Sequence, residues 1–550
     1  MKPTTPRHVT LEDGRAALRQ GAWEEALDAF EGALRADEED AAAWEGLAIA
    51  ALWLEDHSRV IEARERSHAL YGAAGDLPAA ARLALELGGA HLELRGEMVI
   101  ANGWFQRGRR ILSDLPPTPE HALVHIWDAF FALEGAHDPD AARAHAERAV
   151  EVAEATGASD LTMLGRALTG VSRVIGGEVG PGMALLDEAV ASAVAGESND
   201  PDIICRTCCC MIDACEQVRD WGRATEWCDR LRALSERWRV DSFLATCRVK
   251  YSGVLLWRGE WEAAEEELTR ARDHFATTRP SSAAAPMVRL AEVRRRQGRR
   301  KEAEALLDGV GTDPRAVPVR AALAIDAGEA DLAAELLMSL LRRIPERALT
   351  LRVHIHELLV RAELARDHTG EAASVLAQLE ALTEEIGTVP MRAAALSAGG
   401  ALAFASGDSE RARDCFEEAA HLFERSGSPY ECACARVEMS RALHALGSRD
   451  RATSEAAGAL AVLDPMGAVP AADAARKLTG ERAAPDTSVL TPRQREVLAL
   501  AAEGLTDREI GERLFISEYT VHRHMSDILA RLGVPTRTGA VGKALREGLL

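Results

Sequence analysis

A short pattern recurs along most of this 550-residue chain and constrains its fold more than any other feature. A glycine is followed five residues later by an alanine, and further apolar residues follow that alanine at i+4 and i+7. In the first copy, Gly21 leads to Ala26, Phe30 and Ala33. Residues at this spacing share one face of a helix, and a small residue among them lets two helices approach closely. The pattern predicts the second helices of tetratricopeptide-like helix pairs.

The alanine returns at a nearly constant interval through the second half of the chain. The separations are 40, 39, 30, 39, 40 and 40 residues, against a usual tetratricopeptide period of about 34, so most helices should be longer than usual. The register is looser before residue 224, but helix pairs continue there. We predict an all-α fold of roughly eleven or twelve pairs between about residues 10 and 465, stacked as a right-handed solenoid, with no strands. The alanines are Ala224, Ala264, Ala303, Ala333, Ala372, Ala412 and Ala452, of which Ala224 and Ala372 lack the preceding glycine.

Composition supports a helical protein, and the N-terminal sequence predicts no export signal. Aromatic residues make up 4% of the chain, which is rich in the helix formers Ala, Leu, Glu and Arg. The N-terminal segment has no apolar core, so no signal peptide is expected. The most apolar run, 393–405, is shorter than the roughly 20 residues of a membrane span. Because ten cysteines without an export signal fit a reducing compartment, we expect a cytoplasmic protein with no membrane segment.

Residues 488–550 follow a different pattern, with the start and stop signals of four short helices. The run TPRQ at 491–494 predicts one helix start, and Thr506 with Glu509 forms a capping box for the next helix. Ser517 caps a third helix that should run to about residue 532, and a last helix should cover about 538–547. Two short helices followed by a longer one with a polar face predict a helix-turn-helix.

The third of these helices has two distinct faces. One face should pack inward and consists of Val521, His524, Ile528 and Leu532. The opposite face consists of Tyr519, His522, Arg523, Ser526 and Ala530. An arginine can pair with guanine in the major groove, and hydroxyl groups can contact phosphates. The outward face therefore predicts contact with DNA, and a core position is favoured for His524.

In these features, residues 490–550 resemble the LuxR/GerE family of DNA-binding domains almost end to end. The matching runs are LTPRQREVL at 490–498, ISEYTVHRH at 516–524 and ILARL at 528–532. The resemblance implies a transcription regulator that binds double-stranded DNA as a homodimer. The sequence departs from the family pattern at His522, where Lys is usual, at Gln494, where Glu is usual, and at Asp527, where Asn is usual.

The resemblance also implies roles for individual side chains. Residues at the positions of His522, Arg523 and Ser526 face the groove in family members, and several others lie near the DNA backbone. The predicted DNA-binding set is Thr506, Arg508, Ser517, Tyr519, Thr520, His522, Arg523, Ser526 and Arg537. Val541, Ala544 and Leu545 are predicted to form the dimer seam, with packing inside the domain as the alternative.

A long helical repeat body before such a module resembles the sensor and output regions of MalT-like regulators. Those regulators usually carry a nucleotide-binding module, but this sequence contains no Gly-x-x-x-x-Gly-Lys-Ser/Thr motif and no receiver pattern. We predict a repeat domain over 1–465, a linker over 466–487 and a LuxR-type domain over 488–550. The repeat groove is expected to bind a protein or small-molecule effector. The alternative is an interaction scaffold whose tail binds DNA weakly or not at all.

The distribution of charge separates the two parts of the chain. The net charge is −22, whereas residues 488–550 hold nine basic and eight acidic side chains, a balance of +1, which leaves −23 on the remainder. DNA would repel so acidic a body, so contact should be confined to the tail. Because the tail itself is weakly charged, we expect a single copy to bind DNA with modest affinity and to need a second copy.

Three clusters in the body allow a sharper and a more ordinary interpretation. The cysteine-rich run 203–215 could bind metal, but core packing is favoured. His354 and His356, two residues apart, diverge on a helix, so a zinc site there is disfavoured. The basic run 294–301 could contact DNA or pair with the acidic helix over 262–267, and pairing is favoured. We predict no catalytic residues, no cofactor and no metal; Trp23 and Trp261 are expected in the core.

Overall fold

The computed structural model describes residues 10–198, 200–238, 241–480, 490, 492–514, 516–532 and 534–547. Within these ranges, the side chains of residues 233–238, 241–244, 247, 281, 492, 519, 523, 530 and 545–547 lie outside the description. All regular elements of the described residues are helices, which confirms the predicted all-α class. The chain divides into two units, residues 1–475 and 476–550, and the described residues of each contain a hydrophobic core of their own.

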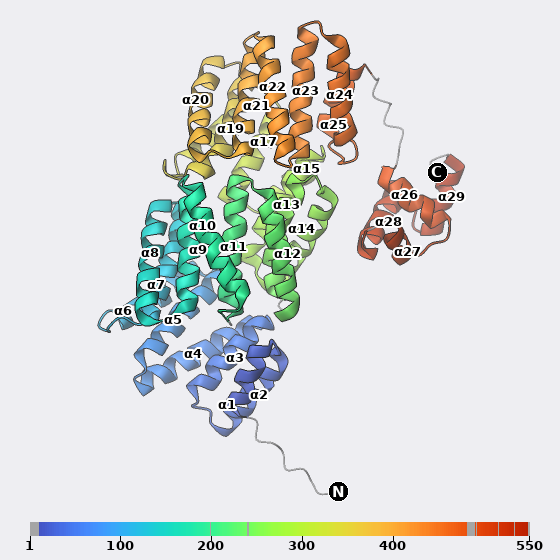
Figure 1. Cartoon of the computed structure of the whole chain (residues 1–550). Coiled ribbons are helices and arrows are strands. Elements are labelled where there is room, and N and C mark those ends of the chain that lie inside the picture. Colours follow the sequence, from blue (N-terminus) through green and yellow to red (C-terminus); the bar gives the residue numbers. More distant parts are fainter. Residues whose placement is uncertain are drawn as a thin grey trace. The chain divides into compact units, whose positions relative to one another are not determined.

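Twelve helix pairs follow one another between Leu11 and Leu463 in the described part of the body (Figure 1). Most helices pack chiefly against their neighbours in sequence, as expected for a repeat array. The first six pairs are α1 (Leu11–Gln20) with α2 (Trp23–Ala36), α3 (Ala41–Trp53) with α4 (His57–Ala74), α5 (Leu77–Arg95) with α6 (Met98–Leu112), α7 (Pro119–Phe131) with α8 (Pro139–Thr156), α9 (Ser159–Ile175) with α10 (Val179–Ala195), and α11 (Pro201–Val218) with α12 (Trp221–Trp238).

The second half of the body continues the array. Its pairs are α13 (Asp241–Trp257) with α14 (Trp261–Thr278), α15 (Ala284–Arg296) with α16 (Arg300–Asp308), α17 (Val317–Asp326) with α18 (Ala330–Leu341), α19 (Leu349–Ala365) with α20 (Thr369–Ile386), α21 (Val389–Ala405) with α22 (Ser409–Arg425), and α23 (Pro429–Ala445) with α24 (Arg449–Leu463). Helices α16 and α17 are only nine and ten residues long. Their shortness explains why Ala303 and Ala333 are 30 residues apart instead of about 40.

Small residues occupy the contacts between helices, as the sequence predicts. The eight predicted alanines, from Ala26 to Ala452, are at most 1% exposed. The turn five residues before each alanine has a left-handed backbone, which glycine adopts without steric cost; for example, Gly407 has a φ of +84°. The two units without the glycine use the same conformation, since Arg219 and Asp367 both have a φ of +60°. The turn geometry is therefore kept where its usual residue is absent.

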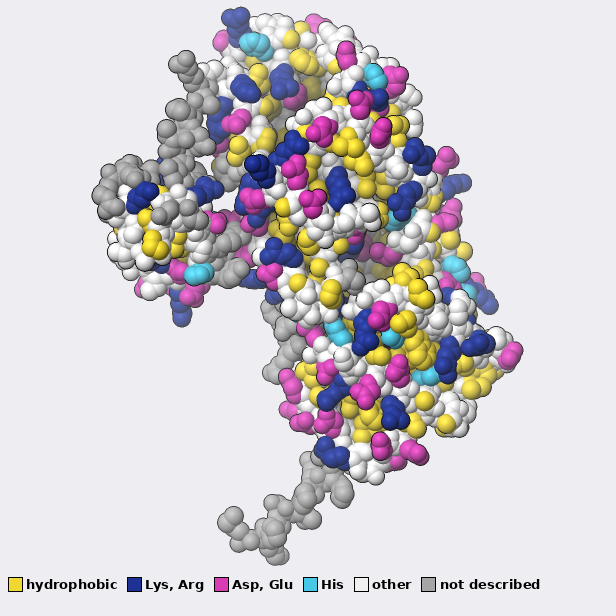
Figure 2. Space-filling view, turned by 180° about the vertical axis from the view of Figure 1, so that it is seen from behind, with side chains coloured by type: hydrophobic (Ala, Val, Ile, Leu, Met, Phe, Trp, Pro, Cys, Tyr) yellow, Lys and Arg dark blue, Asp and Glu magenta, His cyan; other side chains and the backbone are white. Residues whose placement is uncertain are grey.

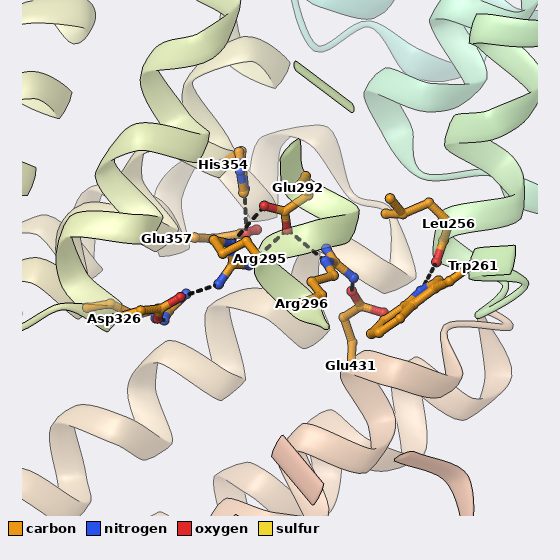
Figure 3. Close-up of polar contacts among 10 residues, drawn as sticks. Leu256, Trp261, Glu292, Arg295, Arg296, Asp326, His354, Glu357 and Glu431 are labelled. Atoms are coloured by element: carbon orange, nitrogen blue, oxygen red, sulfur yellow. Dashed lines mark hydrogen bonds and ion pairs between the residues drawn. The ribbon is translucent and has the colours of Figure 1, made fainter. Parts of the chain in front are cut away.

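Buried ion pairs join parts of the array that lie far apart in sequence. Arg219 at the end of α11 donates to Glu357 on α19 at 2.7 Å, and Arg296 on α15 donates to Glu431 on α23 at 3.0 Å. Figure 3 shows Glu292 beside Arg295 and Arg296, with Arg296 reaching on to Glu431. In the same view, the indole N–H of Trp261 donates to the carbonyl oxygen of Leu256. The ion pairs Arg219–Glu357 and Arg296–Glu431 connect helices that the repeat pattern alone does not bring together.

The ordinary interpretations of the three clusters are confirmed. Cys208, Cys210 and Cys215 are buried on α11, and burial raises the pKa of each thiol. His356 is buried, with its ring hydrogen-bonded to the carbonyl oxygen of Arg352, while His354 is exposed on the helix surface. In the basic run, Arg294 donates to both carboxylate oxygens of Glu265. Trp23 and Trp261 are buried, as predicted.

Acidic and basic side chains are interspersed over the face of the body that Figure 2 shows. The arginines of the basic run also have acidic partners: Arg295 is paired with Glu292 and Asp326, Arg299 with Glu302, and Arg300 with Glu304. The basic run is therefore part of the ion-pair network of the body.

The linker prediction began too early. Helix α25 (Val469–Thr479) lies within the segment 466–487 that was assigned to a linker. Its buried side chains are Ala472 and Ala475, which are too small to give a recognisable apolar stripe. Residues 481–489, which include the end of that segment, lie outside the described residues. Among the helices described, none is long and apolar enough to cross a lipid bilayer.

Candidate nucleic-acid interface

The described residues of the C-terminal unit contain four complete helices. They are α26 (Pro492–Ala502), α27 (Asp507–Leu514), α28 (Glu518–Leu532) and α29 (Arg537–Glu547), close to the predicted bounds. The apolar stripes of all four meet in one core, whose buried members are Leu490, Val497, Leu498, Ala501, Ile510, Val521, Met525, Ile528, Leu532, Ala540 and Ala544. This core holds α28 by one face and leaves His522 and Ser526 exposed.

Local hydrogen bonds fix the start of α27. The backbone N–H and the hydroxyl of Thr506 donate to the Glu509 carboxylate at 2.7 and 2.8 Å, and the Glu509 N–H donates back to the hydroxyl at 3.3 Å. This is the predicted capping box. The hydrogen bonds from Thr506 lower the pKa of the exposed Glu509 carboxyl. Thr506 is thus placed at the N-terminus of α27 by its own side-chain contacts.

The turn between α27 and α28 depends on a close approach of two backbones. The N–H of Ile516 donates to the carbonyl oxygen of Gly511 at 3.0 Å. A Cβ atom at Gly511 would lie 2.7 Å from the carbonyl oxygen of Ile516, so a side chain there would push the turn away. Ser517 then caps α28, since its hydroxyl accepts from the N–H of Thr520 at 3.1 Å. The geometry is that of a helix-turn-helix with a tight, glycine-dependent turn.

The two faces of α28 agree with the sequence pattern where side chains are described. Val521, His524, Ile528 and Leu532 are buried, which confirms the core position predicted for His524. His522 and Ser526 are exposed, and the Ser526 hydroxyl donates to the carbonyl oxygen of His522 at 3.0 Å. Tyr519, Arg523 and Ala530 share this helix, but their side chains lie outside the described residues. The exposed face presents an imidazole and a hydroxyl, groups that can donate and accept hydrogen bonds.

The Asp507 carboxylate lies beside both Arg537 and His522 at the edge of this face. Asp507 accepts a hydrogen bond from Arg537, which also donates to the carbonyl oxygen of Leu505. The second carboxylate oxygen of Asp507 lies 3.5 Å from Nδ1 of His522. These contacts link the starts of α27 and α29 to the exposed face of α28. Asp507 is absent from the predicted set, although its place at the first residue of α27 was a signal that its side chain could reach a neighbouring helix.

Two more predicted DNA-binding residues, Arg508 and Thr520, differ in their exposure. Arg508 is exposed on α27 and pairs with Glu512 at 3.2 Å. Thr520 departs from the prediction, because its side chain is 2% exposed and its hydroxyl is bonded to that of Ser517 at 2.8 Å. A buried side chain of this kind positions the start of α28 and does not present its hydroxyl to DNA.

The predicted dimer seam needs a correction. Ala544 is fully buried in the core of its own unit, one helical turn after the equally buried Ala540. Residues at i and i+4 share a helix face, so Ala544 packs inward and cannot meet a second copy. Val541 is half-buried, and the side chain of Leu545 lies outside the described residues. Of the three predicted residues, Val541 keeps a described side chain that is partly available for a partner.

Comparison with known proteins identifies this unit. The model of the family described as bacterial regulatory proteins, luxR family, matches residues 488–544. The spore germination protein GerE of Bacillus subtilis is 47% identical over 62 residues, which are 11% of this chain and 84% of that protein. LiaR, a transcriptional regulatory protein of B. subtilis, is 49% identical over 72 residues, 13% of this chain and 34% of LiaR. The unit is therefore a LuxR-type helix-turn-helix, the DNA-binding domain of transcriptional regulators.

The match to a larger relative is also short. A protein of Mycobacterium tuberculosis is 41% identical over 76 residues, which are 14% of this chain and 9% of the relative. The chain thus spans about a tenth of that relative and about a third of LiaR. Among solved structures, the APC/C hetero-tetramer Cut9-Hcn1 contains a chain that aligns with 97% of this one at a TM-score of 0.45 and 14% identity, with 95% of that chain covered.

Proposed function

The chain belongs to the luxR family of bacterial regulatory proteins, and on this premise we propose that it is a sequence-specific transcription regulator that binds double-stranded DNA through residues 488–550. The observation that carries the proposal is the division of α28 into a buried stripe and an exposed face that includes His522 and Ser526. A helix held in this way can enter the major groove while the rest of the unit stays outside it.

In this proposal, α28 reads base edges and the neighbouring helix ends position it. His522 and Arg523 supply donors to bases, with Arg523 assigned from its place in the sequence. Ser526, Thr506, Arg508 and Arg537 contact or orient the DNA backbone. Val541 contributes to contact with a second copy, so that two tails bind half-sites about one helical turn apart.

We also propose that the repeat body controls whether two tails can pair on DNA. The support is the joining of a long helical array, which offers surfaces for a protein or small-molecule effector, to a DNA-binding tail. The charge of −23 on the body gives a physical reason for control, since an acidic mass held close to DNA opposes binding. Effector binding would act by changing how the tails are presented.

The alternative function is an interaction scaffold with weak DNA binding. One observation favours it: Arg508 and Arg537 each lie beside a carboxylate of their own unit. Cations engaged in this way must leave these partners, or share them, to contact phosphates. Weak binding with little dependence on salt would favour the scaffold, because release of counterions makes a genuine DNA complex salt-sensitive.

Chromatin immunoprecipitation with sequencing tests the regulator directly. The proposal predicts sharp peaks that share a two-fold symmetric sequence and that disappear in an Arg523→Ala strain. A second comparison tests the control step, using the full chain and the segment 488–550 with and without cell extract. Equal binding by both under all conditions would remove the control role and leave the DNA-binding role intact.

A further inference from the structure

Two histidines and an aspartate meet on the fourth helix pair, far in sequence from the DNA-binding unit. His125 and Asp128 are one helical turn apart on α7, and His145 lies on the facing helix α8. One potential ligand atom from each of the three lies within 4.8 Å of the others. Among the described residues, this is the group of three whose side chains come together in the manner of a metal site.

The separation of the two imidazoles fits a shared metal ion. Nδ1 of His125 and Nδ1 of His145 are 3.4 Å apart. Two nitrogen ligands, each about 2.0–2.1 Å from a tetrahedral zinc ion, lie about 3.4 Å from each other. The rings are tilted by 31° with their centroids 5.6 Å apart, so both nitrogens can point toward one position between the helices.

One carboxylate oxygen of Asp128 can bind an ion, and the other accepts a hydrogen bond from a neighbouring arginine. Oδ1 of Asp128 accepts from Arg109 on α6, while Oδ2 lies 3.9 Å from Nδ1 of His145. An outer partner that fixes a ligating carboxylate is the usual arrangement around protein metal sites. The distance from Oδ2 to Nδ1 of His145 exceeds the ideal tetrahedral edge of about 3.3 Å, a difference that a small rotation of the carboxylate removes.

A neighbouring histidine shows how these two differ from a purely structural one. His121, one turn before His125 on the same helix, has both ring nitrogens occupied: Nδ1 accepts from the N–H of Thr118 at 3.1 Å, and Nε2 is 3.1 Å from the carbonyl oxygen of Leu112. His121 therefore serves to cap α7. His145 and Asp128 have side chains that are 41% and 23% exposed, so water can reach the cluster and complete the coordination of an ion.

We propose that His125, Asp128 and His145 form a binding site for a divalent transition-metal ion of the zinc class, with two imidazole nitrogens, one carboxylate oxygen and one water molecule as ligands. Nitrogen and oxygen donors in this number suit zinc better than magnesium or calcium, which prefer oxygen ligands alone. The ion would join α7 to α8 across the π-helical turn η1 (Ala132–Ala136) that separates them. The site lies in the repeat body and goes beyond the proposed function.

Cobalt(II) titration of the full chain tests the site, because the visible absorption of cobalt reports tetrahedral coordination. We expect saturation at one equivalent, with bands of a tetrahedral nitrogen and oxygen site. His145→Ala should abolish these bands or weaken binding at least tenfold, while His421→Ala, at an exposed histidine on α22, should leave binding unchanged. The proposal is overturned if cobalt gives no tetrahedral bands, or if His145→Ala binds like the parent.

Two further measurements distinguish the proposed ligands from sulfur ligands and from a simple contact between the two imidazoles. The chain has ten cysteines, so a thiolate-to-cobalt band in the near ultraviolet would show that sulfur holds the ion and would contradict the proposal. Zinc should raise the thermal unfolding midpoint of the parent and of His421→Ala but not of His145→Ala, because a ligand stabilises only a folded state that binds it. Arg109→Gln should keep the cobalt bands, since Arg109 is not a ligand. If zinc shifts all variants equally, the two histidines merely share a hydrogen bond.

Discussion

Arg296 on α15 donates to Glu431 on α23 with 3.0 Å between Nη1 and Oε1, although 135 residues separate the two in the chain. Both side chains are largely buried, at 9% and 14% exposure. Burial raises the pKa of the Glu431 carboxyl, and Arg296 partly offsets this effect. The ion pair therefore connects α23, near the end of the repeat array, to α15 in its middle.

Removal of one partner of this pair should therefore be costly. Glu431→Ala leaves the buried Arg296 guanidinium with Glu292 as its remaining carboxylate partner and should lower the free energy of unfolding by about 1–3 kcal/mol. Urea unfolding followed by circular dichroism measures the change. The control is Arg299→Ala, which breaks an exposed pair with Glu302 and should change stability by at most about 1 kcal/mol. Equal effects of the two substitutions would show that the buried pair has no special role.

A second buried pair gives stability a defined dependence on pH. Burial alone would raise the pKa of Glu357, but Arg219 and His354 outweigh it and lower the value to about 2 from the usual 4.5. A folded-state pKa below the unfolded one stabilises the fold above about pH 4.5, and the contribution is lost as the pH falls toward 2. The stability difference between the parent and Glu357→Gln should therefore be large at neutral pH and shrink below about pH 4. A difference that stays constant from neutral pH to pH 3 would contradict the assignment.

Two glycines in helices should respond oppositely to the same substitution. A Cβ at Gly46 on α3 would overlap the ring of Phe30, whereas a Cβ at Gly103 on α6 meets no other atom within 4 Å. Gly46→Ala should lower the free energy of unfolding by about 1–3 kcal/mol through overpacking. Gly103→Ala should raise it by about 0.5–1 kcal/mol, because alanine favours the helix. Chemical unfolding of both variants measures these changes, and a stabilised Gly46→Ala would mean that the α2–α3 seam has room for a methyl group.

Asp507 should weaken DNA binding while it orders the tail. Its carboxylate engages Arg537 and lies 3.5 Å from His522, and its negative charge would lie near phosphates in the proposed complex. Asp507→Asn keeps the size of the side chain and removes the charge, so DNA affinity should rise about threefold or more, with a steeper dependence on salt. Fluorescence anisotropy with a bound fragment measures both quantities. A loss of affinity in a variant whose tail remains folded would reverse the role given to Asp507.

The sequence predicted the features that depend on local spacing. The seam alanines from Ala26 to Ala452 were found because a small residue at a fixed distance from a turn is typical of one helical contact, and the burial of His524 followed from the periodicity of its helix. The pairs Arg206–Glu93 and Arg296–Glu431 could not be found in this way. They depend on how the array curves, which small rotations between successive helix pairs determine.

The wrong prediction for Ala544 and the missed contact between His125 and His145 also have physical causes. Ala544 suits a dimer seam and a domain core equally well, since alanine fills either contact without a polar signal, and only its partners in the fold decide. Histidines close together on one helix, such as His354 and His356, are visible in a sequence as candidate metal ligands. His125 and His145 are not, because they are 20 residues apart and meet only where α7 and α8 pack against each other.

A mobility-shift assay of the full chain against fragments of the host genome, repeated over a series of salt concentrations, shows whether α28 reads DNA. The variants are His522→Ala and Arg523→Ala on α28, with Arg495→Ala on α26 as a control that removes the same charge from an exposed position. The parent and Arg495→Ala should form a specific, salt-sensitive complex, which Arg523→Ala should lose. A complex that is unchanged in both α28 variants, or no specific complex with any fragment, would contradict the claim that α28 reads DNA.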